Sequence, residues 1–327
     1  MALSARLTTL TIAAALLAAP APALAADPGC GAVVTEDVVL GSDLTGCPGD
    51  GLVVAAAGVT VDLNDHRVSG TGLGAGIRVQ APDVTVRRGT ITGFDRGVSV
   101  VVDAVGAARL RGLEIASNGR GVVLGTGFNA TGPGSLALVN ARVHDNAGAG
   151  VAASGWRFET VVRDSAIRRN GGAGISFSDS FGGTVTGSWI AGNRTGVVYD
   201  FATGGRVERN LISGNDIWGL FGFRAGGMTV TENVIASNGT PGELSGGAYT
   251  SEGGTRFERN VFAFNSGDGL LVEEDEEHRP SWPIRNNLAI ANSGWGINAQ
   301  PGFPNSGNIA RRNGQKAQCL NVVCRRG

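Results

Sequence analysis

The feature that most constrains this chain is a short phrase that recurs from Asn193 to Gly269: an Asn, a few further residues, and a Gly followed by an aliphatic side chain. Asn215-Asp-Ile-Trp-Gly219-Leu220 and Asn265-Ser-Gly-Asp-Gly269-Leu270 are two of its copies. Similar Asn residues recur along the chain at intervals of 21 to 28 residues: Asn118, Asn146, Asn170, Asn193, Asn215, Asn238, Asn265, Asn292 and Asn313. A repeat of roughly 22 residues is typical of solenoids and propellers.

Each repeat also contains short runs in which apolar and polar residues alternate, such as Thr184-Val-Thr and Thr255-Arg-Phe-Glu. Alternation at period two indicates β-strands. The repeat is too short for a four-stranded propeller blade, and it lacks the amphipathic run that a helical repeat needs. Two or three short strands joined by tight bends fit. The sequence therefore predicts an all-β, parallel β-helix of about ten coils, which the crossover rule for parallel strands makes right-handed.

The recurring Asn and Gly have expected roles in this architecture. A tight bend needs a residue in the left-handed region, which Asn tolerates and Gly occupies freely. Stacked coils place equivalent Asn side chains about 4.8 Å apart, so their amides can bond to one another along the array. The Gly before each aliphatic residue is expected to let the chain turn into the next strand.

The first 25 residues have the features of a secretory signal. Arg6 precedes an apolar segment from Leu7 to Ala19, and Ala23-Leu24-Ala25 offers a cleavage site. The remaining chain carries 26 basic and 28 acidic side chains, because Arg6 is the only charged residue in the signal. This near-neutral charge gives no electrostatic case for nucleic acid or for an anionic membrane as partner. We expect an exported protein with no membrane span in the mature chain.

The four Cys residues lie at the two extremities of the chain. In an exported protein the economical pairing joins Cys30 to Cys47 and Cys319 to Cys324, although three connectivities are formally possible. A shared metal site is the alternative, but it requires the two ends of a solenoid to meet. We therefore expect disulfides at both ends of one domain: a signal at 1–25, an N-terminal cap at 26–51, the β-helix at 52–314 and a Cys-bounded tail at 315–327.

The start of the mature chain adds a resemblance to a known family. It reads Cys30-Gly, then Leu44-Thr-Gly-Cys47-Pro-Gly-Asp-Gly-Leu-Val, then Gly58-Val-Thr-Val-Asp-Leu63 with His66 and Gly70. With the Asn-rich coils that follow, this resembles the secreted right-handed parallel β-helix repeat proteins common in actinobacteria. More broadly, the chain is similar to the pectin-lyase-like superfamily of polysaccharide lyases, glycoside hydrolases, uronan epimerases and phage tailspikes. The resemblance implies the fold and a polysaccharide partner, but fold alone does not carry function.

Two enzyme signatures of that superfamily are missing. The Asn-Thr-Asp, Asp-Asp, Gly-His-Gly and Arg-Ile-Lys segments of polygalacturonase-type hydrolases do not occur, and neither does the Asp-Pro-His-Glu segment of alginate epimerases. Pectate-lyase-like enzymes need acidic residues on Ca²⁺ and an Arg or Lys base, a pattern without a compact signature. A lyase is therefore preferred over a hydrolase if the protein is an enzyme.

The second and fourth residues after each coil Gly are expected to point outward from one strand face. They are Ser176 and Ser178, Val198 and Asp200, Phe221 and Phe223, Tyr249 and Ser251, and Leu271 and Glu273. Aromatic rings beside carboxylates on consecutive coils suit a carbohydrate site. The candidate binding residues are Asp179, Phe221, Phe223 and Glu273, and the candidate catalytic residues are Asp200, Arg224, Tyr249, Glu252 and His278. The five Trp residues are expected to pack in the core or to stack between coils.

The densest acidic run, Glu273 to Glu277, is most simply a solvated loop. Its functional alternative is a Ca²⁺ site made by Glu273, Glu274 and Asp275, because Ca²⁺ prefers several oxygen ligands. Two hypotheses result. The first is a secreted polysaccharide-interacting protein, with lyase activity on uronate-containing glycans as its enzymatic form. The second is a non-catalytic carbohydrate-binding or cell-surface structural protein. The sequence leaves the oligomeric state open.

Overall fold

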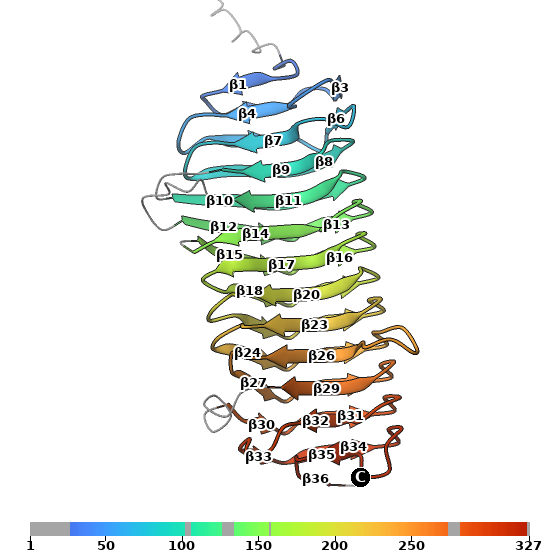
Figure 1. The fold of residues 1–327 in the computed structure, drawn as a ribbon. Helices are drawn as coiled ribbons and strands as arrows, with labels where there is room; N and C mark the ends of the chain where they lie inside the picture. Colours follow the sequence, from blue (N-terminus) through green and yellow to red (C-terminus); the bar gives the residue numbers. More distant parts are fainter. Residues whose placement is uncertain (1–26, 102–105, 126–133, 157, 274–281, 326–327) are drawn as a thin grey trace, which may run out of the picture.

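The computed structural model describes residues 27–101, 106–125, 134–156, 158–273 and 282–325. These residues wind into one elongated stack of coils, which runs from the N-terminal strands at one end to the C-terminal strands at the other (Figure 1). All strand pairings among them are parallel, no helix occurs, and none of the chain so described could span a membrane as a helix. The fold is the right-handed parallel β-helix that the sequence predicts.

Each coil carries strands on three faces, which we call face A, face B and face C in chain order. Face A is a 13-stranded sheet, slightly more than the about ten coils expected. Its strands are β1 (Ala32–Val34), β4 (Leu52–Val54), β7 (Ala75–Val79), β9 (Arg96–Val100), β11 (Arg120–Gly125), β14 (Val151–Gly155), β17 (Ala173–Ser180), β20 (Thr195–Asp200), β23 (Trp218–Phe223), β26 (Gly246–Ser251), β29 (Asp268–Glu273), β32 (Ile297–Ala299) and β35 (Cys319–Leu320).

Faces B and C share two long strands, β8 (Val84–Thr92) and β10 (Gly106–Ala116), which pass through the corner between them. The other strands of face B are β2 (Val38–Val39), β5 (Thr60–Asp62), β12 (Gly134–Val139), β15 (Phe158–Arg163), β18 (Gly183–Thr186), β21 (Arg206–Glu208), β24 (Met228–Thr231), β27 (Thr255–Glu258), β30 (Ile284–Arg285) and β33 (Asn305–Ser306). The other strands of face C are β3 (Leu44–Cys47), β6 (Arg67–Gly70), β13 (Arg142–His144), β16 (Ala166–Arg168), β19 (Trp189–Ala191), β22 (Leu211–Ser213), β25 (Val234–Ala236), β28 (Val261–Ala263), β31 (Leu288–Ile290), β34 (Asn308–Arg311) and β36 (Cys324–Arg325).

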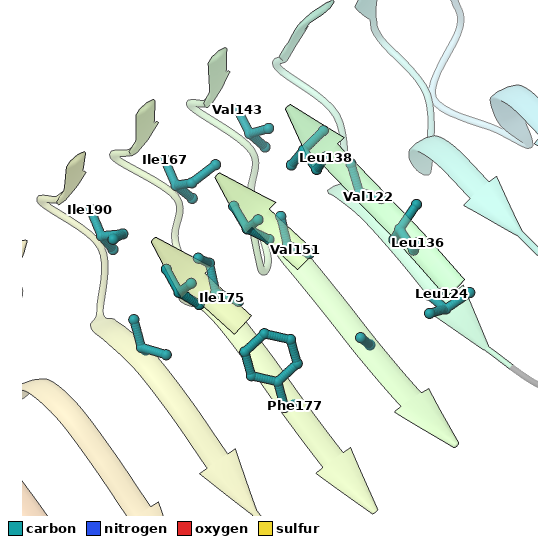
Figure 2. Packing of buried hydrophobic residues seen from close by; sticks show 14 of the residues in the cluster. Val122, Leu124, Leu136, Leu138, Val143, Val151, Ile167, Ile175, Phe177 and Ile190 are labelled. Carbon is teal, nitrogen blue, oxygen red and sulfur yellow. The ribbon is translucent and has the colours of Figure 1, made fainter. Parts of the chain in front are cut away.

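The core is a continuous column of aliphatic and aromatic side chains inside the coils. Strand alternation points every second residue inward, so like residues stack from coil to coil. Ile167 and Ile190 on face C lie opposite Ile175 on face A, with Phe177 farther along the same strand (Figure 2). All four side chains are fully buried. The apolar area removed from water by this column is the main stabilising term of the fold.

Two ladders of buried polar side chains run beside the core. The first, at the corner between faces C and A, consists of the recurring Asn residues from Asn118 to Asn313. Asn193 is representative: its backbone N–H and its Nδ2 both donate to Asn215 Oδ1, at 3.0 and 3.2 Å. The second ladder, between faces B and C, consists of Ser165, Ser188, Asn210, Asn233, Asn260, Asn287 and Asn308. The expected amide bonding along the array is confirmed.

The expected conformational roles are wrong for the ladder Asn and for the Gly before each aliphatic residue, although other Gly residues, such as Gly192 and Gly214, do take the left-handed position in bends. The left-handed residue of each bend is the one before the ladder Asn, such as Arg169 with φ 51° and Phe264 with φ 57°. The Asn itself turns its side chain inward to satisfy backbone groups. The coil Gly lies within a face A strand: a Cβ on Gly196 would stand 2.9 Å from Asn215 Nδ2 and would collide with the Gly219 carbonyl oxygen. Close packing of coils, not turning, requires this Gly.

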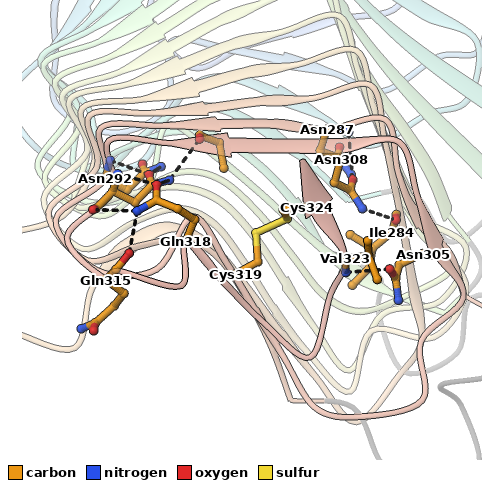
Figure 3. The surroundings of a disulfide bond; sticks show 12 residues. Ile284, Asn287, Asn292, Asn305, Asn308, Gln315, Gln318, Cys319, Val323 and Cys324 are labelled. Carbon is orange, nitrogen blue, oxygen red and sulfur yellow. Dashed lines mark hydrogen bonds between the residues drawn. A yellow bond between two sulfur atoms is a disulfide. The ribbon is translucent and has the colours of Figure 1, made fainter. Parts of the chain in front are cut away.

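Both ends of the stack are fastened covalently, with the pairing predicted: Cys30 to Cys47 and Cys319 to Cys324. At the C-terminal end Gln318 also closes the first ladder. Its Oε1 accepts from the backbone N–H of Asn313 at 2.9 Å and from Asn313 Nδ2 at 3.0 Å, while its Nε2 donates to the Gln315 carbonyl at 2.6 Å (Figure 3). The last ladder amide therefore has partners although no further coil follows. The predicted signal, residues 1–25, lies outside the described residues.

Candidate functional site

Face A carries the outward columns that the sequence predicts. The strand register stacks Ser176, Val198, Phe221, Tyr249 and Leu271 in one column, and Ser178, Asp200, Phe223, Ser251 and Glu273 in the next. Within a column, neighbours are separated by one strand spacing, about 4.8 Å. All of these side chains except Ser251, which is buried, are half-buried or exposed. A chain-like ligand laid along the stack would meet one pair of these residues per coil.

A third column follows at the corner where face A ends. Asp179, Phe201, Arg224 and Glu252 take this position on consecutive coils, and each has a φ between 47° and 53°. The left-handed conformation turns the backbone away from face A and leaves the side chain outside. The structure thus places Asp179, Arg224 and Glu252 together, as expected, and adds Phe201 to them.

Aromatic rings on these columns pack against one another. Phe221 stacks on Tyr249 with ring centroids 5.3 Å apart, and the buried Trp218 supports Tyr249 from 5.5 Å. Phe201 meets Phe223 edge to face at 5.5 Å. Such pairs add stabilisation beyond burial and hold the rings in fixed orientations. The result is a pre-formed aromatic surface across the coils of β20, β23 and β26.

One charged side chain at the edge of face A, that of Arg224, packs against this aromatic surface. The Arg224 guanidinium lies over the rings of Phe201 and Phe223, at 5.3 and 5.1 Å, and its Nε donates to Glu252 Oε2 at 2.7 Å. These contacts orient a cation beside two rings. Asp200, by contrast, makes no ion pair within the part of the chain that the structure describes. Among those residues it is an unpaired acceptor, next to Phe223 in the same column.

Tyr249 is a hydrogen-bond donor in this arrangement. Its Oη donates to Glu273 Oε2 at 3.0 Å. Partial burial of the ring raises the pKa of the hydroxyl, and the Glu273 carboxylate raises it further. The hydroxyl therefore keeps its proton at neutral pH. This geometry favours a role in ligand binding over proton abstraction by the free tyrosinate.

The metal and loop predictions fall largely beyond the described part of the chain. Glu274, Asp275 and His278 lie outside the described residues, whereas Glu273 stands at the end of β29 with its carboxylate bonded to Tyr249. Among residues 27–101, 106–125, 134–156, 158–273 and 282–325, no group of three His, Cys, Asp or Glu side chains could hold a metal ion. The Ca²⁺ site stays a prediction.

Sequence reasoning missed part of the aromatic surface. Trp156 and Phe181, in the turns that leave face A on two consecutive coils, are 48% and 58% exposed and meet edge to face at 5.9 Å. With Phe201 they extend the aromatic residues along the same edge. Trp156 and Trp189, which is 43% exposed, are not in the core, but each packs against a side chain of a neighbouring coil, Phe181 and Arg168 respectively. The sequence does contain a signal for these exposed rings, because each aromatic residue stands next to a Gly-rich turn.

These features define the protein as a three-faced right-handed parallel β-helix with an aromatic outer surface. The family model described as "Right handed beta helix region" matches residues 33–203, 126–244 and 182–325. The chain therefore belongs to the right-handed β-helix family. Together the three matches cover all the described residues except 27–32.

Solved structures share the fold at low sequence identity. The Dettilon tailspike protein matches with a TM-score of 0.53 at 12% identity over 89% of this chain, which spans 60% of the tailspike chain. The A-module of the Azotobacter vinelandii mannuronan C-5 epimerase AlgE6 matches with a TM-score of 0.52 at 15% identity, over 91% of this chain and 92% of the module. No curated protein matches the sequence. At these identities the likeness concerns the fold alone.

Proposed function

We propose that the protein binds a polysaccharide along face A. The observation that carries this proposal is the aromatic and carboxylate surface built by Phe221, Phe223, Tyr249, Asp200 and Glu273 on consecutive coils. Sugar rings stack on flat aromatic faces, and their hydroxyls bond to carboxylates and to guanidinium groups. A glycan is itself a repeating chain, so it suits a surface that repeats at every coil. The similarity to an epimerase named for mannuronan is consistent with this partner.

Binding without catalysis is the form of this function that the contacts support best. Arg224 is held by Glu252, and Tyr249 is held by Glu273, so both candidate bases already have carboxylate partners. The outer columns also carry Asp179, Asp200, Glu252 and Glu273 against the single cation Arg224. A uronate polymer would be repelled by this excess of negative charge unless a cation bridged it.

A uronate lyase is the second candidate. It is favoured by the proximity of Arg224 and Tyr249 to several carboxylates, an arrangement in which bound Ca²⁺ and a base could act on the same sugar. Export of the protein forms part of the proposal in both cases. The signal-like segment at residues 1–25 and the two disulfides support an oxidising location outside the cell.

The test of binding compares glycan affinity in wild type and in Tyr249→Ala by isothermal titration calorimetry. The panel contains neutral and uronate polysaccharides. We expect Tyr249→Ala to lower affinity by about tenfold, because the ring and the hydroxyl are both lost. Ser213→Ala, on face C, is the control and should bind like wild type. Equal affinity of Tyr249→Ala and wild type would contradict binding along face A.

The lyase candidate has a separate readout. Wild type is incubated with pectate, alginate and glycosaminoglycans, with and without Ca²⁺, while the ultraviolet absorbance of an unsaturated uronate product is followed. A rise that disappears in Arg224→Ala supports lyase activity. No rise on any polymer excludes the lyase for these substrates and leaves binding as the function.

A further inference from the structure

A groove lies at the corner between faces B and C, on a different side of the coil from the aromatic surface of face A. Its volume is about 660 Å³, and its walls come from the coils of Asp65 through Trp189. The strand register counts five coil steps between the strand of Arg67 and that of Trp189. At the usual strand spacing the groove is therefore about 24 Å long.

The groove exists because most corner residues over these coils are short, and the one long side chain among them, Arg88, is turned to Asp62. Gly112 and Gly187 occupy the left-handed corner position in two of the coils, and each lines the groove. The same position holds long side chains in later coils: Arg209, Glu232 and Arg259. These three form ion pairs along the corner, with Arg259 Nη2 2.9 Å from Glu232 Oε1. The groove therefore ends at the coil where this corner position changes from Gly to Arg and then Glu.

The regular ladder beneath this corner also changes under the groove. Later coils use Asn at the inward position, from Asn210 onward, whereas the groove coils use Ala141, Ser165 and Ser188. The Ala141 backbone N–H donates to Ser165 Oγ at 3.1 Å, and the Ser165 N–H donates to Ser188 Oγ at 3.2 Å. A chain that departs from its own repeat gives up local regularity, which proteins do most often at functional sites.

Some polar side chains in the groove are held by hydrogen bonds, and others have no ion-pair partner among the described residues. Glu114 Oε1 lies 3.1 Å from His144 Nε2, and His144 Nδ1 lies 2.7 Å from Asp145 Oδ2. Arg169 donates twice to Asp145, so Glu114 is held through a chain of three further side chains. Arg142 follows Glu114 in the same outward column, on the next coil. Neither Arg142 nor Asp65 forms an ion pair within the described ranges.

Trp189 closes one end of the groove. The Arg168 guanidinium lies 4.5 Å from the centre of its ring, which fixes the orientation of the indole. Ala166 precedes Trp189 in the same column, so only a methyl group stands in front of the ring. Among the described residues, the groove therefore combines an oriented aromatic wall with the unpaired guanidinium of Arg142, the unpaired carboxylate of Asp65, and the carboxylates of Glu114 and Asp164, which are bonded to His144 and Arg163.

The charged side chains that line the groove indicate which class of ligand it could bind. Three carboxylates, of Asp65, Glu114 and Asp164, face one guanidinium, that of Arg142. Among the described residues, the lining itself holds no cluster of cations for a polyanion: the flanking Arg163 and Arg168 are engaged by Asp164 and by the Trp189 ring, and the exposed Arg111 stands alone before Gly112. The strands along the groove pair with a coil on each side, so they offer no free edge to an extended peptide. Hydroxyl-rich, uncharged sugars match the remaining donors and acceptors.

We propose that this groove is a second binding site, which takes an extended neutral oligosaccharide along the helix axis. The proposal concerns residues that share no side chain with the face A surface. A protein with both sites could hold two glycan chains at once, or two stretches of one chain. The groove site stands or fails independently of the face A proposal.

The test fills the groove without disturbing the fold. Gly112 has φ +61°, and a Cβ there meets no atom within 4 Å. The same corner accepts Arg88 and Arg209 with φ 53°, so Gly112→Arg should fold. Gly214 at the corner between faces C and A is the matched control, with φ +62° and equally open space. Arg169 takes the same corner position on another coil, so Gly214→Arg should also fold. It adds no side chain to the groove.

Neutral cello-, xylo-, manno- and malto-oligosaccharides, with oligogalacturonate as the charged comparison, are titrated into each variant by calorimetry. For the neutral oligosaccharide that binds, we expect Gly112→Arg to lower the affinity at least about tenfold and Gly214→Arg to change it less than about twofold. Trp189→Ala should also weaken binding, whereas Leu211→Ala, in the same column one coil beyond the groove, should not. Tyr249→Ala should leave this binding event unchanged.

Four outcomes would overturn the proposal. One is that no neutral oligosaccharide binds to the wild-type protein. Another is that Gly112→Arg binds the neutral ligand as tightly as wild type and Gly214→Arg do. The third is that oligogalacturonate binds the groove more tightly than every neutral ligand. Loss of binding in Tyr249→Ala alone would support the face A site and contradict the groove site.

Discussion

At the scale of single residues, the distance between neighbouring coils decides which side chains the chain can use. Gly196 shows this most directly, because a Cβ there would lie 2.8 Å from Ile212 Cγ2 and 2.9 Å from Asn215 Nδ2. Both neighbours are buried parts of the core and the ladder. The smallest side chain is required although the backbone conformation is one that any residue adopts.

We therefore expect Gly196→Ala to lower the free energy of unfolding by about 3 kcal/mol or more through overpacking. Gly125→Ala is the control, because a Cβ at Gly125 meets nothing within 4 Å. That change should fall within about 0.5 kcal/mol of wild type or stabilise slightly. Urea unfolding followed by circular dichroism measures both. Wild-type stability in Gly196→Ala would show that the coils can separate to admit a methyl group.

At the scale of elements, the Asn ladder joins each bend to the next. Every internal member accepts two hydrogen bonds from the preceding coil and donates to the following one, while Nδ2 also reaches a strand carbonyl. The ladder leaves few backbone groups of the buried corner unsatisfied. An unsatisfied buried donor costs about 1–3 kcal/mol, so each rung matters more than a surface hydrogen bond.

Asn215→Ala should lower the free energy of unfolding by about 2–4 kcal/mol, because the backbone N–H and Nδ2 of Asn193 lose their shared acceptor. Asn215→Ser should cost less, since Ser165 and Ser188 fill the equivalent role in the second ladder. Ser213→Ala, which changes an outward side chain of the same coil, is the control. Denaturant unfolding separates the three variants. A loss as large in Ser213→Ala as in Asn215→Ala would mean that the effect is not specific to the ladder.

At the scale of the whole molecule, each coil contacts only its neighbours, so stability is the sum of many similar interfaces and the ends are its weakest part. Disulfides and Gln318 close these ends where no further coil covers the core. The C-terminal bridge encloses a separation of only 5 residues, whereas the N-terminal bridge encloses 17. A short loop restricts the unfolded chain less, so the C-terminal bridge acts mainly on the local structure.

Replacing both C-terminal cysteines, in the double variant Cys319→Ser with Cys324→Ser, should therefore increase hydrogen exchange in β34, β35 and β36. The middle coils, such as those of β17 and β20, should keep wild-type protection. Hydrogen-exchange mass spectrometry measures the boundary between the two regions. Replacing Cys30 and Cys47 in the same way is the comparison at the other end. Loss of protection in the middle coils of the C-terminal variant would contradict nearest-neighbour behaviour.

The candidate sites were predictable to different degrees. The period-two alternation of strands and the landmarks of the repeat were enough to place Phe221, Tyr249 and Leu271 in one outward column, because strand geometry is local. The sequence did not show that Arg224 pairs with Glu252 and lies over Phe201, since those contacts depend on rotamers and on neighbouring coils. The groove at Gly112 was missed entirely. It depends on which side chains are small at one corner across six stacked coils.

The coil, the parallel stacking, the amide ladder and the disulfide-fastened ends could all be predicted from the amino-acid sequence. Each of these follows from a repeat and from local preferences of strands, Asn, Gly and Cys. Packing between coils was needed to show that Arg169 and its equivalents, not the ladder Asn, adopt the left-handed bend, and that Gly196 is required by contact with the next coil. The same packing sets where the surface is aromatic and where it is hollow. Those properties arise between coils that are one repeat apart in sequence, and no short stretch of sequence contains them.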